Sequence, residues 1–455
     1  MIRRVLIANR GEIAVRIIAS CRALGVETVA VYSNADRDGL WTHLADRALC
    51  IGPARSSESY LNAPALVTAA LGSGCDALHP GYGFLAENAA FAKLCEENGI
   101  IFIGPSADAI AQMGNKISAR RIAKSAGVRT VPGSEGLLEN VAAARRIGDE
   151  AGYPLLLKAA AGGGGRGMRI VATPGELASC FAEAEAEARA AFGDGSLYAE
   201  RFLERVRHIE VQILADGRGR TIHLGERDCT LQRRAQKLFE EAPATVLASS
   251  VRAALTTAAV ALAGQIGYRS LGTIEFVFDP TDEAFYFLEM NTRIQVEHPV
   301  TEMVTGLDLV AEQLAIANGE TLRLEQGDVR TDGHAIECRI NAEDPDRDFR
   351  PAPGKIVRWS PPSGAGIRVD THAFEGYTIP PFYDSMIAKL IVHGTNRTDA
   401  IARARSALAA FHVEGLPTTI PFHARLLADE RLLENETDTK WVEREYLAAR
   451  SAVRG

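Results

Sequence analysis

Five polar side chains recur at every second position within one short stretch of this 455-residue chain. If the stretch is extended, all five lie on one face, because successive side chains of a strand point to opposite faces. A solvated amphipathic strand is the commoner outcome of such alternation. Buried charges of both signs are costly unless they are paired or liganded, so we favour a functional site. The five residues are Glu289, Asn291, Arg293, Gln295 and Glu297.

The strand before this stretch supplies another carboxylate. If the two strands form a hairpin in which Phe278 pairs with Ala284, Glu275 lies diagonal to Glu289 on the same face, at roughly 7–8 Å between backbone positions. Mg²⁺ prefers a few carboxylates together with substrate phosphate oxygens. Glu275 and Glu289, supported by Asn291, therefore predict a magnesium site beside ATP, where the ion would neutralise charge during phosphoryl transfer.

The last three members of the polar face suit a small anion. Arg293 has the charge to grip a carboxylate or bicarbonate, and Gln295 has the amide to orient it. Glu297 is then placed to accept a proton from that anion.

A glycine-rich loop joins two apolar, strand-like runs over residues 158–169. Its central glycines include Gly163, Gly164 and Gly165. Glycines let backbone N–H groups turn toward phosphate oxygens, and Lys158 adds positive charge. A P-loop would need Gly-Lys-Ser/Thr leading into a helix, which this stretch lacks. The loop therefore predicts the phosphate flap of an ATP-grasp lid, with a flexible linker as the alternative.

Two further basic residues have candidate roles. Lys237 ends a basic cluster that is usually a solvated face, but beside a phosphate loop it would carry transition-state charge. Arg339 lies on the polar face of an alternating run, where it would stabilise an oxyanion on the acceptor. For Arg339, a salt bridge to Glu337 or Asp344 is an equally good interpretation.

The elements that position these residues begin with a βαβ unit. A strand-like run at 3–8, a helical period at 11–24 and a second strand at 27–32 are typical of a doubly wound domain. Residues 81–86 match the dinucleotide pattern G-x-G-x-x-G/A, but they lie far from the first βαβ turn, where that fingerprint belongs. We therefore do not expect a nicotinamide enzyme.

The pattern changes twice after the first unit, so the fold class is α/β and α+β multidomain. We expect an N-terminal unit at 1–113, a central unit at 114–325 with a small lid at about 131–203, and a mixed antiparallel unit at 334–442. The length of the chain is consistent with about three such units.

Composition argues against several classes of protein. The net charge of −8 provides no basic footprint for nucleic acid. Seven cysteines are scattered, with no two closer than 20 residues, so a zinc knuckle or a redox pair is not expected. No apolar run approaches the roughly 20 residues that span a bilayer, and the strand-like start leaves no room for a signal peptide. We expect a cytoplasmic protein with no membrane partner.

Six motifs together resemble the biotin carboxylase family, and the likeness runs from residue 2 to about residue 440. The motifs are 7–14, 79–85, the glycine loop, 233–243, 289–299 and 383–386. The resemblance implies an N-terminal Rossmann-like domain, an ATP-grasp centre with a mobile lid, and a C-terminal domain that completes the site. It also implies a homodimer.

Carried over by position, the resemblance implies a role for each candidate residue. The nucleotide would contact Lys116, Lys158, the loop glycines, His208 and Gln232, with Glu200 and Leu203 at the adenine hinge. Mg²⁺ or Mn²⁺ would be held by Glu275, Glu289 and Asn291. Bicarbonate would be bound by Arg293, Gln295 and the backbone of Val296, with Glu297 as its base and Lys237 assisting the phosphates. Biotin would meet Tyr82, Gly83 and Arg339.

In such enzymes bicarbonate attacks the γ-phosphate of ATP to give carboxyphosphate, which breaks into CO₂ and phosphate. The phosphate deprotonates biotin, which captures CO₂. No methionine of the chain precedes a lysine, as it would in a carrier domain. The resemblance therefore implies a separate subunit that needs a biotin carboxyl carrier protein and carboxyltransferase subunits, as in acetyl-CoA or acyl-CoA carboxylases.

Two other functions compete with this interpretation. A different ATP-grasp ligase would join a carboxylate to an amine, but the face from Arg293 to Glu297 disfavours it. A nucleotide-binding regulatory paralogue would have lost turnover. Its only hint is Ala235, which stands where many relatives have a histidine or asparagine, so that ATP affinity is expected to be weaker.

Overall fold

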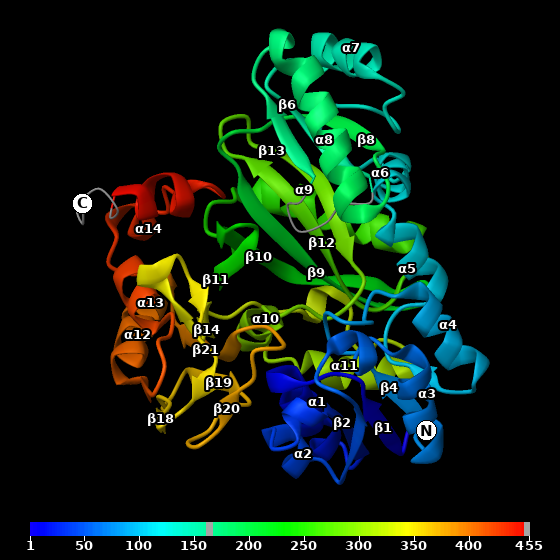
Figure 1. Cartoon of the computed structure of the whole chain (residues 1–455), viewed down its shortest axis with the longest axis vertical. Helices are drawn as coiled ribbons and strands as arrows, with labels where there is room; N and C mark the ends of the chain where they lie inside the picture. The colour runs from blue at the N-terminus through cyan, green and yellow to red at the C-terminus, as the bar shows by residue number, and fades with distance from the viewer. Residues whose placement is uncertain (161–166, 450–455) are drawn as a thin grey trace.

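A five-stranded parallel sheet forms the N-terminal part of the molecule, at the bottom of Figure 1. The computed structural model describes residues 1–160 and 167–449. The sheet order is β3-β2-β1-β4-β5, and the three central strands are mostly buried apolar runs, as in sheets covered on both faces, whereas the edge strand β3 has no buried residue. The strands are β1 (Arg4–Ile7), β2 (Glu27–Ser33), β3 (Arg47–Gly52), β4 (Ala77–His79) and β5 (Ile101–Phe102). The helices are α1 (Gly11–Ala23), α2 (Leu40–Leu44), α3 (Ala63–Gly72), α4 (Ala89–Glu97) and α5 (Ala107–Gly114).

An antiparallel sheet of eight strands carries most of the candidate residues, in the order β13-β12-β9-β10-β11-β14-β21-β19. Its strands are β9 (Arg207–Asp216), β10 (Thr221–Arg233), β11 (Gln236–Ala242), β12 (Arg269–Asp279), β13 (Ala284–Asn291), β14 (His334–Asn341), β19 (Ile367–Thr371) and β21 (Met386–Gly394). The accompanying helices are α6 (Lys116–Ser125), α9 (Ser249–Gln265), α10 (His298–Thr305) and α11 (Leu309–Ala317). The sheet runs across the predicted boundary at 325–334, because β11 pairs directly with β14.

A separate three-stranded sheet, at the top of Figure 1, lies within the predicted lid. Its order is β7-β6-β8, and two helices pack against it. The elements are β6 (Leu155–Ala159), β7 (Met168–Val171), β8 (Leu197–Arg201), α7 (Val141–Ala151) and α8 (Leu177–Phe192). The antiparallel pairing of β6 with β7 confirms the predicted strands on either side of the glycine loop. Gly163, Gly164 and Gly165 themselves lie outside the described residues.

The C-terminal part packs helices against one face of β14 and β21 and has its own apolar core. Its helices are α12 (Arg397–Ala410), α13 (Ile420–Leu426) and α14 (Glu430–Leu433), followed by a π-helical turn at Val442–Leu447. Its short strands are β15 (Glu343–Asp344), β16 (Arg350–Pro351), β17 (Gly354–Lys355), β18 (Arg358–Ser360), β20 (Thr378–Ile379) and β22 (His412–Glu414). Short 3₁₀ turns occur at Asn34–Asp36, Ser56–Glu58, Pro174–Glu176, Gln326–Asp328 and Pro345–Arg347. Over residues 1–160 and 167–449, no helix combines the length and apolarity that a membrane span requires.

The predicted extended run from 289 to 297 is wrong beyond Asn291, where β13 ends. β13 is the edge strand of its sheet, and the amide of Thr292 donates to the carboxylate of Glu87 at 3.1 Å instead of continuing a ladder. The chain then turns into α10, whose first turn contains Pro299. Proline suits the first turn of a helix, where its missing N–H costs nothing.

The predicted register of the β12–β13 hairpin is also wrong. Phe278 pairs with Phe285, and a bulge after Glu275 shifts the remaining pairs by one residue. Glu275 therefore lies directly opposite Glu289. A bulge places two residues opposite one, so residue pairs that are counted outward from the turn are wrong by one position beyond the bulge.

Candidate active site

A cavity of about 400 Å³ lies between the eight-stranded sheet and the lid. Despite the turn after Asn291, all five residues of the predicted polar face line it. Other lining residues come from the start of α6, from the lid, from the strands and turns between β9 and β13, and from β14. The cavity is lined by Lys116, Lys158, Met168, His208, Gln232, Ala235, Gln236, Lys237, Glu275, Leu288, Glu289, Asn291, Arg293, Gln295, Val296, Glu297 and Arg339.

Two acidic side chains, Glu275 and Glu289, face each other across neighbouring strands at this cavity. Burial raises the pKa of Glu289, and the negative charge of Glu275 raises it further. Two carboxylates held together in a cleft favour a cation between them, so this pair fits a divalent ion. The predicted third ligand is already engaged, because Asn291 donates to Glu275 at 2.8 Å and accepts from Arg293 at 2.7 Å.

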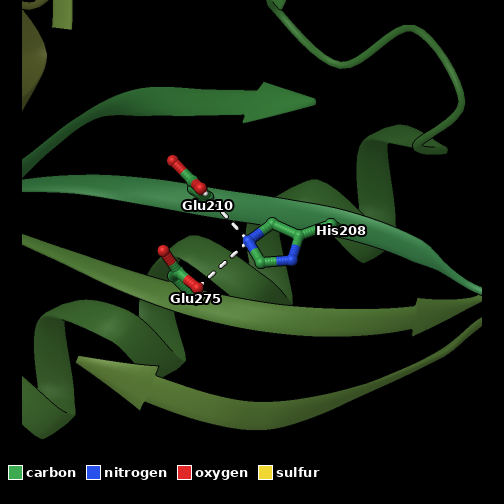
Figure 2. Close-up of side chains that lie close together, drawn as sticks. All are labelled: His208, Glu210 and Glu275. Carbon is green, nitrogen blue, oxygen red and sulfur yellow. Dashed lines mark hydrogen bonds and ion pairs between the residues drawn. The ribbon is translucent and has the colours of Figure 1, made fainter. Parts of the chain in front are cut away.

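His208 is held between two buried carboxylates, as Figure 2 shows. Its Nε2 lies 3.1 Å from both Glu210 Oε1 and Glu275 Oε2. Burial alone would lower the pKa of His208, but the two carboxylates outweigh it and raise the pKa to about 9. The imidazole is therefore charged at neutral pH and adds a positive group to the lining of the cavity.

Lys237 connects three acidic side chains of the site. Its ammonium donates to Glu297 Oε1 at 2.7 Å, to Glu275 Oε1 at 3.0 Å and to Glu210. Burial would lower the pKa of Lys237, but these carboxylates hold it well above its usual value. The lysine thus keeps its positive charge at the cavity wall.

Glu297 is buried and has a cation on each oxygen. Lys237 binds Oε1, and Arg339 Nη2 donates to Oε2 at 3.0 Å. Burial alone would raise the pKa of Glu297, but Lys237 and Arg339 hold it below its usual value. Glu297 is therefore ionised at neutral pH and ready to accept a proton.

Arg339 is oriented by a second carboxylate. Its Nε donates to Glu240 Oε1 at 2.6 Å. The alternative of a salt bridge to Glu337 or Asp344 is therefore wrong, because the partners of Arg339 are Glu240 and Glu297, and among the described residues neither Glu337 nor Asp344 bonds to it. Burial raises the pKa of Glu240 to about 7, and the charge of Glu297 contributes to the rise.

The predicted anion-binding residues are fixed by further contacts. Arg293 donates to Glu87 Oε2 at 2.8 Å as well as to Asn291. Gln295 donates to Glu275 at 2.9 Å and accepts from Arg227 at 2.7 Å. Both side chains therefore have set orientations at the cavity wall.

A second cavity of about 410 Å³ adjoins the first and shares four lining residues with it. The shared residues are Gln236, Lys237, Val296 and Arg339. Tyr82 and Gly83, predicted to meet the acceptor, line this second cavity. The other lining residues are Asn9, Arg10, Gly11, Glu12, Ser56, Phe84, Asn341, His372, Phe382, Tyr383, Asp384, Ser385 and Met386.

Two predicted hinge residues do not line the first cavity. Glu200 on β8 instead forms buried ion pairs with Lys158 and Arg120. Leu203 follows β8 and is partly exposed. Glu200 thus positions Lys158, which does line the cavity.

Sequence reasoning missed several residues of the site. Glu210 follows His208 by two positions on β9, and this period-two spacing would have placed both on one face. Arg227 is fully buried and bonds to Glu210 and Gln295, whereas Glu87 comes from the turn before α4. The sequence around Arg227 or Glu87 has no pattern that indicates a site, because tertiary folding alone brings these residues next to it.

Family models match nearly the whole chain. Residues 1–110 match "Biotin carboxylase, N-terminal domain", and residues 337–444 match "Biotin carboxylase C-terminal domain". Residues 115–325 match "Carbamoyl-phosphate synthase L chain, ATP binding domain".

Named relatives are similar over their full length. Biotin carboxylase 1 of Bacillus subtilis is 56% identical over 97% of this chain and 98% of its own. A solved biotin carboxylase complex with β,γ-ATP from Campylobacter jejuni has a TM-score of 0.95 and 46% identity, covering 98% of this chain and 99% of its own. The biotin carboxylase domain dimer of a Hydrogenobacter thermophilus 2-oxoglutarate carboxylase, solved with MgADP, ADP and bicarbonate, has a TM-score of 0.93 and 50% identity, covering 97% of each chain.

Proposed function

The chain belongs to the biotin carboxylase family, and we infer from this that it catalyses the ATP- and bicarbonate-dependent carboxylation of biotin. The residue assignments below are our proposal. The observation that carries them is the position of Glu297, an ionised carboxylate held by two cations where the two cavities meet.

ATP and bicarbonate occupy the first cavity in this proposal. Lys116, Lys158, His208 and Gln232 contact the nucleotide, together with the loop glycines. Glu275 and Glu289 hold the divalent cation, with Asn291 supporting Glu275 through its hydrogen bond. A bound Mg²⁺ or Mn²⁺ would neutralise charge on the phosphates during transfer.

Bicarbonate is held by the guanidinium of Arg293, the amide of Gln295 and the backbone of Val296. Glu297 removes its proton, and the resulting carbonate oxygen attacks the γ-phosphate as the bond to the β-phosphate oxygen breaks. ADP leaves, and the product is carboxyphosphate. Lys237 lies 2.7 Å from Glu297 and stabilises the negative charge that develops beside it.

Biotin occupies the second cavity against Tyr82 and Gly83. Carboxyphosphate splits into CO₂ and phosphate, and the phosphate removes the proton of the ureido nitrogen. The nitrogen then captures CO₂, while Arg339 stabilises the oxygen of the ureido enolate. Arg339 lines both cavities, which supports this shared role.

The assembly follows from the same proposal. Biotin is delivered on a biotin carboxyl carrier protein, and carboxyltransferase subunits pass the carboxyl group to the final acceptor. We also propose a homodimer, as in the Hydrogenobacter domain dimer. The cytoplasmic location expected from the sequence stays a prediction.

Release of ADP tests the function directly. ADP release should require bicarbonate, and free biotin should accelerate it in a magnesium-loaded sample. An absent biotin effect would count against carboxylation of biotin. Nucleotide binding without ADP release would favour the regulatory paralogue instead.

A further inference from the structure

Lys389 on β21 is a fully buried lysine that contacts the walls of both cavities without lining either. Its ammonium donates to the carbonyl oxygen of Val296 at 2.8 Å and lies 3.2 Å from Glu12 Oε1. Lysine is almost never fully buried unless it is paired. A role in packing alone would favour an apolar side chain at this buried position, so the charge pair indicates a further role.

Glu12 extends the contacts of Lys389 into the second cavity. It lies in the first turn of α1, and its side chain is 1% exposed. The hydroxyl of Tyr82 donates to the same Oε1 that faces Lys389. A continuous chain of polar contacts thus runs from the backbone of Val296, through Lys389 and Glu12, to the ring of Tyr82.

Two further charged residues lie near the pair. Lys389 is the cross-strand partner of Arg339, so both side chains lie on the same face of the sheet. Asp370 lies 3.9 Å from Lys389 and is held by two hydrogen bonds of 2.7 Å from Arg368. The lysine ammonium therefore has little freedom to leave Val296.

We propose that Lys389 and Glu12 are positioning residues that couple the bicarbonate subsite at Val296 to the biotin subsite at Tyr82. This proposal rests on the function proposed above. Lys389 sets the orientation of the Val296 peptide, and Glu12 sets the orientation of the Tyr82 ring. Because one buried pair does both, binding in one subsite changes affinity in the other, and the effect is reciprocal.

A double variant, Lys389→Met with Glu12→Gln, tests the coupling. Removing only one charge would leave the other buried and unpaired, which destabilises proteins strongly. ADP release is measured over a grid of bicarbonate and free biotin concentrations. The KM for bicarbonate and the KM for biotin should each rise by about tenfold, which is within the range typical of coupling between two sites. The KM for ATP should stay within about twofold, and the KM for biotin should no longer depend on bicarbonate.

Two control variants separate positioning from folding. Lys389→Arg keeps a cationic donor and should restore part of the coupling. Arg207→Met with Asp228→Asn removes another deeply buried pair, which lines neither cavity, and should leave both KM values unchanged. If the double variant does not fold, Glu12→Asp decides, because it keeps the charge and shortens the side chain, and it should raise the KM for biotin without changing the KM for ATP.

Unchanged KM values for bicarbonate and biotin in a folded variant would overturn the coupling. An equal rise in the KM for ATP, or an equal rise in the Arg207 and Asp228 control, would overturn it too. A wild-type protein without bicarbonate-dependent ADP release would instead contradict the proposed function.

Discussion

Glu297 and Arg339 are joined by a hydrogen bond at the border between the two cavities, where Arg339 Nη2 donates to Glu297 Oε2 over 3.0 Å. The proposed base for bicarbonate is therefore held by the residue proposed to stabilise biotin. Lys237 binds the other oxygen of Glu297. Glu297 must therefore accept the proton of bicarbonate while both of its oxygens contact a cation.

Replacing Glu297 with Gln should abolish turnover and spare nucleotide binding. The amide keeps the size of the side chain but cannot accept the proton, so bicarbonate-dependent ADP release should fall on the order of 10²–10⁴-fold. ATP affinity, measured by calorimetry, should change little. Near-normal turnover in this variant would remove Glu297 from the role of base.

Replacing Glu289 with Gln should change the metal dependence of nucleotide binding. Glu289 and Glu275 face each other, so the substitution removes a cation ligand and also relieves charge repulsion. In the absence of Mg²⁺, the variant should bind ATP more tightly than the wild type does. The Mg²⁺ concentration for half-maximal ADP release should rise by about tenfold or more. An unchanged Mg²⁺ requirement would exclude Glu289 as a ligand.

The sequence predicted which residues line the cavity better than it predicted their backbone conformation and strand register. All five members of the polar face reach the cavity, although β13 ends at Asn291. Alternation at period two indicated one shared face, whereas the end of the strand depends on Glu87, which is distant in sequence. The bulge after Glu275 has no local signal either, so the register could not be predicted.

The fold class and the elements around the glycine loop were also predictable from local patterns. The βαβ start and the β6–β7 pair follow from apolar runs bounded by glycines. The continuity of the sheet from β11 to β14 was not predictable, because it joins strands on either side of a predicted boundary. The boundaries at 113, 325 and 334 stay predictions.

Substituting Ala235 should stabilise the turn between β10 and β11. Arg234 and Ala235 have φ values of 50° and 61°, a left-handed conformation that costs roughly 1–2 kcal/mol for a residue with a Cβ. Ala235→Gly should therefore raise the thermal midpoint, and Ala235→Asn should do so while also lowering the KM for ATP, because Ala235 lines the first cavity.

Ala254→Gly is the matched control, since Ala254 is exposed within α9. Glycine in a helix interior costs roughly 1 kcal/mol, so this change should lower the midpoint. A fall in the midpoint for Ala235→Gly as well would show that the turn is not strained.

Replacing Glu337 with Gln should stabilise the protein more at pH 8 than at pH 5. Both carboxylate oxygens of Glu337 are buried and have no hydrogen-bond partner within residues 1–160 and 167–449, and burial raises its pKa well above the usual value, with a further rise from Glu240. Between the unfolded and folded pKa values the native state holds one more proton, so stability falls as pH rises, by about 1.4 kcal/mol per pH unit at most. The amide removes this loss.

Glu241 provides a control of opposite sign for that measurement. Burial would raise the pKa of Glu241, but His334 and Arg397 lower it to about 2. Its contribution to stability is present above the unfolded pKa and is lost as pH falls. Glu241→Gln should therefore destabilise the protein at pH 8, and a pH-independent difference for Glu337→Gln would contradict a protonated Glu337.

Transfer of labelled carbon from bicarbonate to biotin is the direct test of biotin carboxylation by this chain. The purified chain, incubated with ATP, Mg²⁺, labelled bicarbonate and free biotin, should form labelled carboxybiotin only when ATP is present, and Glu297→Gln should form it on the order of 10²–10⁴-fold more slowly. Release of ADP from the wild type with no label on biotin would contradict the account.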